Sequence, residues 1–372
     1  MSVLQKINVG VVGACKRGAS FKNACDALEA VRVHAVCDVD AENLDAAATL
    51  FDASEKYIDY EEMLAKSELD AVIIATPMHL HATQSILAMQ CNLHVLSEVT
   101  AAVSLEECRH LVQACSQSRG IYMMAENANF MKPNVMVREL VRQGLFGTPY
   151  YAEAEYLHEL KKLNEQTPWR RRWQTGIDGV TYGTHSLGPV LQWMPGERVT
   201  EVCCSGSGHH HRDAKGNVYE NQDSCVMLCR MASGGLVKIR VDMLSDRPQW
   251  LNNFYQLQGT DGCYESARAA SEKNRIWLRA KDPNCESWMN LEELENEFLP
   301  ATWKQSREIA EASGHGGSDY FAMVDFAGAV AGSHPPAIGI HEAMDMTLPG
   351  LISQQSIAEG GQWLAVPDSR QW

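Results

Sequence analysis

The stretch GVVGACKRG, residues 10–18, decides the fold of the first part of the chain. The apolar run at residues 6–13 leads into Gly13 and Gly18, spaced as the first and third glycines of a dinucleotide-binding turn. Gly13 predicts a tight turn after a strand, and Gly18 allows a helix to pack closely on that strand. Cys15 stands at the middle position, where glycine normally lets the backbone approach a pyrophosphate. We therefore expect the backbone at Cys15 to lie farther from the pyrophosphate than a glycine would allow, but the turn still to bind a cofactor.

Charged residues near this turn indicate which dinucleotide it holds. Arg17, or alternatively Lys16, is expected to add positive charge beside the phosphates. Asp38 ends the next apolar run, where a carboxylate binds ribose hydroxyls and repels a 2′-phosphate. Asp40 is interpreted as a residue that starts a helix. The predicted cofactor is NAD rather than NADP, and the alternative is a glycine-rich turn that binds nothing.

The pattern of apolar residues predicts two different architectures along the chain. Strand-like runs alternate with helical patterns in the first third, which predicts a doubly wound parallel sheet of the Rossmann type. The strands are expected at residues 6–13, 31–40, 70–76, 92–98 and 120–127, and the helices at 19–30, 41–51, 80–90, 104–118 and 133–146.

After residue 147 the rhythm changes to strand-like runs joined by turns. These runs lie at residues 150–160, 223–231, 236–244, 252–259 and 275–281, and helical patterns follow at 319–331 and 340–361. They predict an α+β domain with a mostly antiparallel open sheet. We divide the chain into an NAD-binding domain, 1–127, and a substrate-binding domain, 128–372, whose C-terminal helix is free to pack back on the first domain.

Composition excludes several classes of function. The chain has 372 residues and a net charge of −15, which argues against nucleic acid as a partner. It has neither a signal peptide nor the roughly 18 consecutive apolar residues of a membrane span, so we expect a cytoplasmic protein. Its twelve cysteines lack C-x-x-C pairs and predict reduced thiols. The three consecutive histidines at 209–211 cannot easily share a tetrahedral metal site, and no metal is expected.

Together these motifs resemble the Gfo/Idh/MocA family of oxidoreductases over nearly the full length of the chain. The matching positions beyond the turn and Asp38 are Thr76, Pro77 and His81 in TPMHLH, Glu98 in LHVLSE, and Glu126 and Asn127 in EN. The resemblance implies that these positions, apart from Glu126, help to bind NAD. The family typically continues its glutamate with Lys-Pro, and the lysine assists hydride transfer. Here Val99 and Thr100 follow Glu98, and valine can neither donate a proton nor carry charge.

One branch is more similar: the NAD-dependent glycoside hydrolases typified by α-N-acetylgalactosaminidase. Its Tyr-x-Thr-His-x-Leu-Gly-Pro motif matches YGTHSLGP at residues 182–189, and its segments PWRRRW (168–173) and HGGSDYF (315–321) also have counterparts there. Two positions depart from the branch, which carries proline at Thr100 and tyrosine at Phe130.

The resemblance implies a reaction in which a hydride leaves sugar C3, the glycosidic oxygen is eliminated, water adds and the hydride returns. His185 is the first candidate for proton handling at C3, because imidazole titrates near neutrality. Tyr182, three residues earlier, is expected to share a helix face with it. Glu98, at the end of a predicted strand, is assigned to the nicotinamide side or to substrate hydroxyls. The alternative for all three is helix packing or capping.

Further residues are assigned to substrate binding. Arg170 is expected to hold substrate oxygens, and Trp169 or Trp173 to stack on a sugar face, whereas Arg171 and Arg172 suit a solvated basic cluster. The remaining candidates are Tyr156, His158, Tyr264 and His315.

The sequence thus predicts a sugar-active NAD enzyme, foremost a glycosidase that recycles its cofactor. The alternatives are an NAD-dependent sugar dehydrogenase or reductase and a non-catalytic NAD-binding regulator. The partner is a carbohydrate or glycoside, and the resemblance implies a homo-oligomer.

Overall fold

The computed structural model describes residues 6–248 and 251–372, which form two compact units. Unit 1 contains the described residues up to Met131, together with Ser306–Met344 and Ser369–Trp372. Unit 2 contains Lys132–Gln305 and Asp345–Asp368. The segment from Ser306 to Met344, which the predicted division at residue 127 assigns to the second domain, therefore belongs to unit 1. The limits of independently folding domains stay a prediction.

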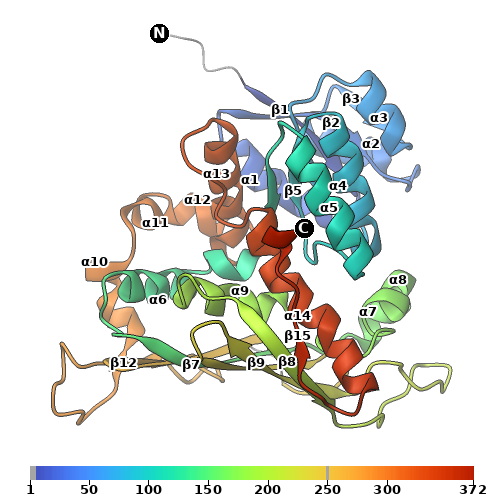
Figure 1. Ribbon diagram of the computed structural model, residues 1–372. Helices are drawn as coiled ribbons and strands as arrows, with labels where there is room; N and C mark the ends of the chain where they lie inside the picture. The colour runs from blue at the N-terminus through green and yellow to red at the C-terminus, as the bar shows by residue number, and fades with distance from the viewer. Residues whose placement is uncertain (1–5, 249–250) are drawn as a thin grey trace. The chain divides into compact units, whose positions relative to one another are not determined.

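Unit 1 is built on a six-stranded parallel sheet with the order β3-β2-β1-β4-β5-β6 (Figure 1). Its strands are β1 (Ile7–Val12), β2 (Val31–Cys37), β3 (Glu55–Tyr57), β4 (Ala71–Ile74), β5 (His94–Ser97) and β6 (Tyr122–Met124). All four residues of β4 are fully buried, as expected for a strand covered on both faces. The carboxyl ends of the strands meet at one edge, where open α/β sheets bind ligands.

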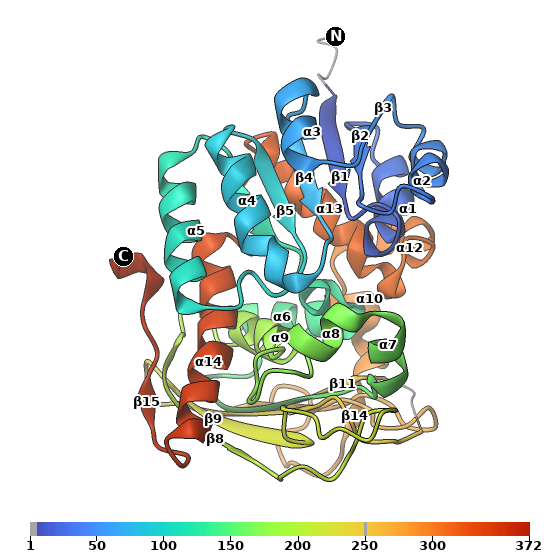
Figure 2. The same ribbon diagram turned by 90° about the vertical axis from the view of Figure 1, so that its right-hand side faces the viewer.

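Helices cover this sheet, and their starts follow recognisable signals. They are α1 (Lys22–Asp26), α2 (Leu44–Phe51), α3 (Tyr60–Lys66), α4 (His81–Gln90), α5 (Leu105–Gln117), α12 (Arg307–Glu311) and α13 (Ser318–Val330), with short 3-10 turns η1 (Arg17–Phe21), η2 (Met78–Leu80), η3 (Asn127–Phe130), η5 (His315–Gly317) and η6 (Ser369–Gln371). Ser104 caps α5 by accepting a hydrogen bond from the Glu107 backbone N–H. Figure 2 shows α4 and α5 side by side on the sheet.

Two details of unit 1 differ from the sequence prediction. The helix expected at residues 19–30 is a five-residue 3-10 turn, η1, followed by five residues of α1. The sequence pattern does not predict β3 or α3. The three half-exposed residues of β3 are too few to show a periodic pattern. The start of α3 could have been recognised from Asp59, whose side chain accepts a hydrogen bond from the Glu62 N–H as an N-cap.

Unit 2 is built on a nine-stranded sheet with the order β14-β13-β12-β11-β7-β10-β9-β8-β15. Its strands are β7 (Pro149–Leu157), β8 (Val199–Gly206), β9 (Ser224–Met231), β10 (Leu236–Asp242), β11 (Asn253–Gly259), β12 (Gly262–Glu265), β13 (Arg275–Leu278), β14 (Met289–Asn290) and β15 (Leu364–Ala365). Only β7 and β10 pair in parallel; the other neighbours are antiparallel. The predicted fold class, a Rossmann sheet followed by a mostly antiparallel one, is confirmed.

One face of this second sheet is covered by helices. The helices of unit 2 are α6 (Lys132–Arg142), α7 (Lys161–Gln166), α8 (Pro168–Trp173), α9 (Thr184–Trp193), α10 (Glu295–Phe298) and α11 (Ala301–Gln305), with the turn η4 (Leu291–Leu294); α14 (Ile340–Ala358) begins in unit 1 and ends in unit 2. Figure 1 shows α6 and α9 lying over the sheet. Trp193 of α9 is fully buried, and its indole N–H donates to the Asn134 carbonyl at 3.0 Å.

Within the described residues, we find no helix with the length and apolarity that a membrane crossing requires. All twelve cysteines are free thiols.

Trp193 provides a test of how unit 2 is held together. We expect Trp193→Ala to lower the free energy of unfolding by about 3–5 kcal/mol, because it removes a buried aromatic side chain together with its hydrogen bond to the Asn134 carbonyl. Urea unfolding followed by circular dichroism measures this loss. Trp288→Ala, which changes an indole that is 46% exposed, is the control and should cost less than about 1 kcal/mol. Equal losses in the two variants would contradict the packing described.

Candidate active site

The glycine turn after β1 leaves no room for side chains at its two glycines. Gly13 has a φ of +80°, and a Cβ there would lie 2.6 Å from the Ala75 carbonyl oxygen. A Cβ on Gly18 would lie 2.6 Å from the Gly13 oxygen, to which the Gly18 N–H donates at 3.0 Å. Both positions therefore require glycine for a physical reason, as a dinucleotide-binding turn does.

Asp38 ties this turn to the end of β2. One carboxylate oxygen accepts from the Cys15 N–H at 2.8 Å and the other from the Asp40 N–H at 3.0 Å. Cys15 Sγ lies 3.8 Å from the Asp40 carbonyl oxygen. Burial, followed by the charge of Asp38, raises the pKa of the Cys15 thiol to about 12, so the thiol stays protonated at neutral pH. Cys15 is thus accommodated in the turn as a small neutral side chain.

Arg17 is enclosed by carboxylates. Its guanidinium contacts Glu98 Oε1 at 2.7 Å and forms a bidentate pair with Asp319, both contacts at 3.0 Å. The Asp319 side chain is 1% exposed. Burial alone would lower the pKa of Arg17, but Glu98 and Asp319 outweigh it and hold that pKa above its ordinary value. The positive charge of Arg17, which the sequence pattern assigns to the cofactor phosphates, is therefore already paired with two carboxylates of unit 1.

Two loops at the carboxyl edge are braced by a buried histidine. The ring nitrogens of His81 lie 2.8 Å from the Thr76 and Thr100 carbonyl oxygens, and the residue is 1% exposed. The Thr76 hydroxyl donates to Gln84 at 2.6 Å, and Pro77 starts the turn η2. Thr100, at the position where the related branch has proline, also donates through its hydroxyl to the Ala102 carbonyl oxygen. His81 thus shapes the edge of the site by holding two backbone segments.

The remaining predicted residue of this edge is Asn127, in η3 directly after β6. It is buried, as is its neighbour Phe130. Its position after a parallel strand fits a cofactor-facing role.

In unit 2, two tyrosines and two histidines of the prediction come together. The ring centroids of Tyr156, Tyr182 and His185 lie 5.3–5.5 Å from one another. The Tyr156 hydroxyl lies 2.8 Å from His158 Nδ1. The Tyr255 hydroxyl donates to the His185 backbone carbonyl at 2.7 Å and so fixes the start of α9. The Tyr156 ring contacts the other three ionisable rings, and the four form a candidate site for proton transfer.

The local structure of Tyr182 differs from the expectation. Tyr182 lies in a turn before α9, with Gly183 as the N-cap, and His185 is the second residue of the helix. Their contact therefore arises from the turn and not from a shared helix face. Because α9 begins at Thr184, Tyr182 and His185 lie on either side of the helix start, with ring centroids 5.3 Å apart.

Arg170 of α8 lies near this cluster. Its guanidinium donates to Gln174 at 2.7 Å and stacks over the Trp169 ring at 4.4 Å. Burial first, and then the charges of Arg170 and His185, lower the pKa of His158. His158 is therefore neutral at pH 7 and able to accept the hydrogen bond of the Tyr156 hydroxyl.

The remaining predicted residues make other contacts. Tyr264 is fully buried, with its ring 5.7 Å from Trp193 and its hydroxyl 3.4 Å from Asn274, so we do not carry it into the proposed site. His315 belongs to unit 1. Arg171 pairs with Glu220 and Asp213, and Arg172 stacks over Trp173.

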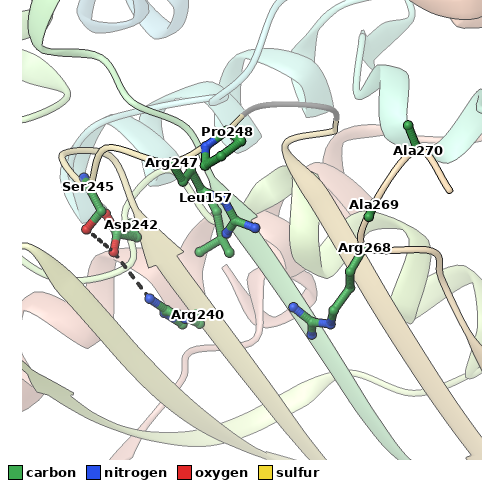
Figure 3. Close-up of a pocket in the computed structure, with 9 residues that line it drawn as sticks. All are labelled: Leu157, Arg240, Asp242, Ser245, Arg247, Pro248, Arg268, Ala269 and Ala270. Atoms are coloured by element: carbon green, nitrogen blue, oxygen red, sulfur yellow. Dashed lines mark hydrogen bonds and ion pairs between the residues drawn. The ribbon is translucent and has the colours of Figure 1, made fainter. Parts of the chain in front are cut away.

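A cavity of about 550 Å³ lies on unit 2 but contains none of the predicted residues (Figure 3). It is lined by Leu157, Arg240, Asp242, Ser245, Arg247, Pro248, Arg268, Ala269 and Ala270. Arg240 contacts Asp242 at 3.3 Å, and Arg268 forms a bidentate pair with Glu155 at 3.1 and 3.2 Å. Because most of its positive charge is paired in this way, we assign the chemistry to the aromatic cluster instead.

Comparison with known proteins identifies the family. Residues 130–371 match the model of the glycosyl hydrolase 109 C-terminal domain, and residues 7–126 match the oxidoreductase family with an NAD-binding Rossmann fold. The chain belongs to glycosyl hydrolase family 109. It is therefore a glycoside hydrolase that carries an NAD-binding Rossmann domain, and the resemblance found in the sequence is confirmed.

Relatives of this family 109 enzyme match it over nearly its full length. A glycosyl hydrolase family 109 protein from Shewanella pealeana is 28% identical, covering 98% of this chain and 86% of the relative. An α-N-acetylgalactosaminidase from Shewanella oneidensis is 27% identical, covering 98% and 85%.

Solved structures share the fold. Levoglucosan dehydrogenase, solved with NADH and levoglucosan, aligns with a TM-score of 0.81 at 18% identity, covering 98% of this chain and 100% of that one. The WlbA dehydrogenase from Bordetella pertussis, solved with NADH and UDP-GlcNAcA, aligns with a TM-score of 0.76 at 21% identity, covering 98% of each chain.

Sequence reasoning missed two residues of these clusters. Asp319 appeared only within the HGGSDYF segment, and its partner Arg17 lies 302 positions away, so no local pattern joins them. Tyr255 sits on a strand whose alternation already explained it as a core residue. Within the described residues, no three histidine, cysteine or carboxylate side chains gather as a set of metal ligands.

The role given to Asp38 can be tested by binding. We expect Asp38→Ser to raise the Kd for NAD about tenfold or more, because it removes the charged acceptor for ribose hydroxyls. The ratio of the Kd for NADP to the Kd for NAD should also fall, because the carboxylate that repels a 2′-phosphate is gone. Isothermal titration calorimetry with each dinucleotide measures both effects. Asp40→Ser is the matched control, since the Asp40 carboxylate is already bonded to Asn43, and it should change Kd less than threefold. A larger effect at Asp40 than at Asp38 would contradict the assignment.

Proposed function

We propose that this family 109 enzyme cleaves glycosides without net oxidation, using NAD as a cofactor that is regenerated in each turnover. The residues of unit 1 fit such a cofactor: the glycine turn excludes side chains at Gly13 and Gly18, and Asp38 presents a carboxylate to a ribose. Asn127, Thr76 and Pro77 complete the expected edge. When bound, NAD supplies hydride acceptance and return at C3 of the sugar.

Two observations together support the proposal: valine at position 99 in place of a lysine, and the cluster of ionisable aromatic rings in unit 2. Val99 is 4% exposed and stands where related dehydrogenases place a proton-handling lysine. The acid–base groups of this chain are instead His185, Tyr182 and Tyr156, whose rings lie in contact. These three side chains can each donate or accept a proton, and a reaction with several proton transfers needs more than one such group.

The steps follow from the chemistry of a sugar ketone. With C3 as a ketone, the C2 proton becomes acidic, and its loss expels the oxygen of the glycosidic bond at C1. Water then adds at C1, a proton returns to C2, and C3 becomes an alcohol again. The sum is hydrolysis of one glycosidic bond with no net oxidation.

We assign the groups as follows. His185 takes the proton of the C3 hydroxyl and later returns it. Tyr182 and Tyr156 exchange protons with C2 and with the departing oxygen, and neutral His158 accepts the hydrogen bond of the Tyr156 hydroxyl. Arg170 and Trp169 bind sugar oxygens and a sugar face. Glu98 holds Arg17 and lies on the side of the cofactor.

The name of the Shewanella oneidensis relative suggests the substrate class. We propose an α-linked N-acetylhexosamine glycoside as the first substrate to test. Self-association of the chain and a cytoplasmic location stay predictions.

The purified enzyme should release p-nitrophenol from the α-N-acetylgalactosaminide at a rate that rises with added NAD, with no accumulation of NADH at 340 nm. NADH formed in step with free sugar would instead support a dehydrogenase. Bound NAD with neither activity would support a regulator.

A pair of variants sharpens this test. His185→Ala should lower kcat by about 10²–10⁴-fold, because it removes a general acid–base group, while NAD binding stays within threefold of wild type. His209→Ala, at an exposed histidine of the same unit, should leave kcat unchanged. Unchanged turnover in His185→Ala would remove it from the mechanism.

A further inference from the structure

The glycine turn of unit 1 offers less to a pyrophosphate than such turns usually do. Its Cys15 N–H is bonded to Asp38, and its Gly18 N–H to the Gly13 carbonyl. The helix that follows is broken into η1 and α1, each of five residues, so it provides no long helix dipole directed at the phosphates. A dianionic pyrophosphate therefore needs positive charge from elsewhere.

Arg17 does not supply that charge in full. Its single positive charge lies between the carboxylates of Glu98 and Asp319, so the three groups together carry one negative charge. Burial opposes ionisation of Asp319, but hydrogen bonds from His315 and Arg17 hold its pKa below the ordinary value. Both carboxylates thus repel an anion unless another cation joins the cluster.

Lys16 lies on the other side of the turn. Asp40, whose pKa is lowered first by the hydrogen bond from Asn43, also has the charge of Lys16 near it. Asp38, whose carboxylate accepts the Asp40 N–H, marks the proposed ribose end of the cofactor site. Lys16 therefore belongs to that end.

His315 is the third side chain that contacts the Asp319 end of the carboxylate cluster. Its Nδ1 lies 2.9 Å from Asp319 Oδ2, on the same carboxylate that Arg17 holds, and its side chain is 45% exposed. A histidine ring that carries an N–H on both nitrogens can donate from Nδ1 to Asp319 and from Nε2 to an anion. Around Nε2, the described part of the chain supplies no hydrogen-bond partner. With Nδ1 held by Asp319, Nε2 is the ring nitrogen left for a ligand.

The loop that carries His315 is specialised in its backbone. Gly314, His315, Gly316 and Gly317 have φ angles of +90°, +43°, +63° and +96°. A histidine in this left-handed region costs free energy that a glycine would not, and such residues concentrate at ligand sites. The Ser318 hydroxyl donates to the His315 carbonyl at 3.0 Å and helps to hold the loop.

The same loop runs beside the glycine turn. A Cβ built on Gly314 would lie 3.9 Å from the Ser20 carbonyl oxygen of η1. Asp319 and Arg17 join the loop to the turn a second time. His315 is therefore placed next to the segment that faces the phosphates of a dinucleotide.

We propose that His315 binds the dinucleotide pyrophosphate through Nε2, with Asp319 and Arg17 as positioning residues that orient its ring. The proposal rests on the proposed use of NAD and moves His315 from the substrate to the cofactor. In this proposal, the positive charge that the glycine turn and Arg17 do not provide to the pyrophosphate comes from a residue far from the turn in sequence. A catalyst that regenerates its cofactor within one site also benefits from slow release.

Binding of cofactor fragments tests the proposal without relying on turnover. We expect His315→Gln to weaken both NAD and ADP-ribose about tenfold or more, because one charge-assisted hydrogen bond to the pyrophosphate is lost. Calorimetry gives the two Kd values, and release of bound NAD after dilution should be faster by a similar factor. His334→Gln is the matched control: this histidine is 43% exposed, belongs to unit 1 and lies 4.0 Å from Asp325. It should change neither Kd by more than twofold.

The outcomes separate this proposal from the proposed function. Unchanged Kd for ADP-ribose in His315→Gln, with NAD affinity or glycosidase activity reduced, would overturn the pyrophosphate contact but leave the redox-neutral hydrolysis standing. Wild-type protein that binds neither NAD nor ADP-ribose would overturn both. Asp319→Asn supplies a second readout: if circular dichroism shows it folded, it should weaken ADP-ribose in the same direction as His315→Gln, and unaltered affinity would remove its positioning role.

Discussion

The guanidinium of Arg17, enclosed by Glu98 and Asp319, is the interaction on which the rest of unit 1 depends. It joins the turn after β1, the end of β5 and the first turn of α13, which lie far apart in the sequence. Removing one member of such a group leaves an uncompensated buried charge, which is costly. The ion pairs therefore fix the edge of the parallel sheet at which a dinucleotide is bound, and they hold the carboxylate that orients His315.

In the proposed function, unit 1 binds the cofactor and unit 2 supplies the acid–base groups. Unit 1 supplies a turn that excludes side chains and a carboxylate at the end of β2. Unit 2 supplies Tyr156, Tyr182 and His185 as contacting rings, with His158 kept neutral. Val99 stands where related dehydrogenases have an assisting lysine, and the proposed mechanism assigns proton handling to groups of unit 2. Membership of family 109 is consistent with this division.

Much of this was predictable from the sequence, since parallel strands, a glycine turn and an Asp38 at its usual distance are local patterns. The contacts of Tyr182 and His185 were also predictable, although a turn rather than a helix face produces them. Asp319 could not be predicted as the partner of Arg17, because 302 residues separate them. The packing of the buried Tyr264 ring on Trp193 could not be predicted either, because its sequence neighbours do not reveal that contact.

The central claim is that a glycosidic bond is broken by elimination from a C3 ketone. Hydrolysis in D₂O, with the sugar product analysed by NMR and mass spectrometry, tests it most directly. The account predicts one deuterium at C2 of the released sugar, because the C2 proton is lost and replaced from solvent. Product that keeps its C2 hydrogen after cleavage would contradict elimination and indicate direct displacement at C1.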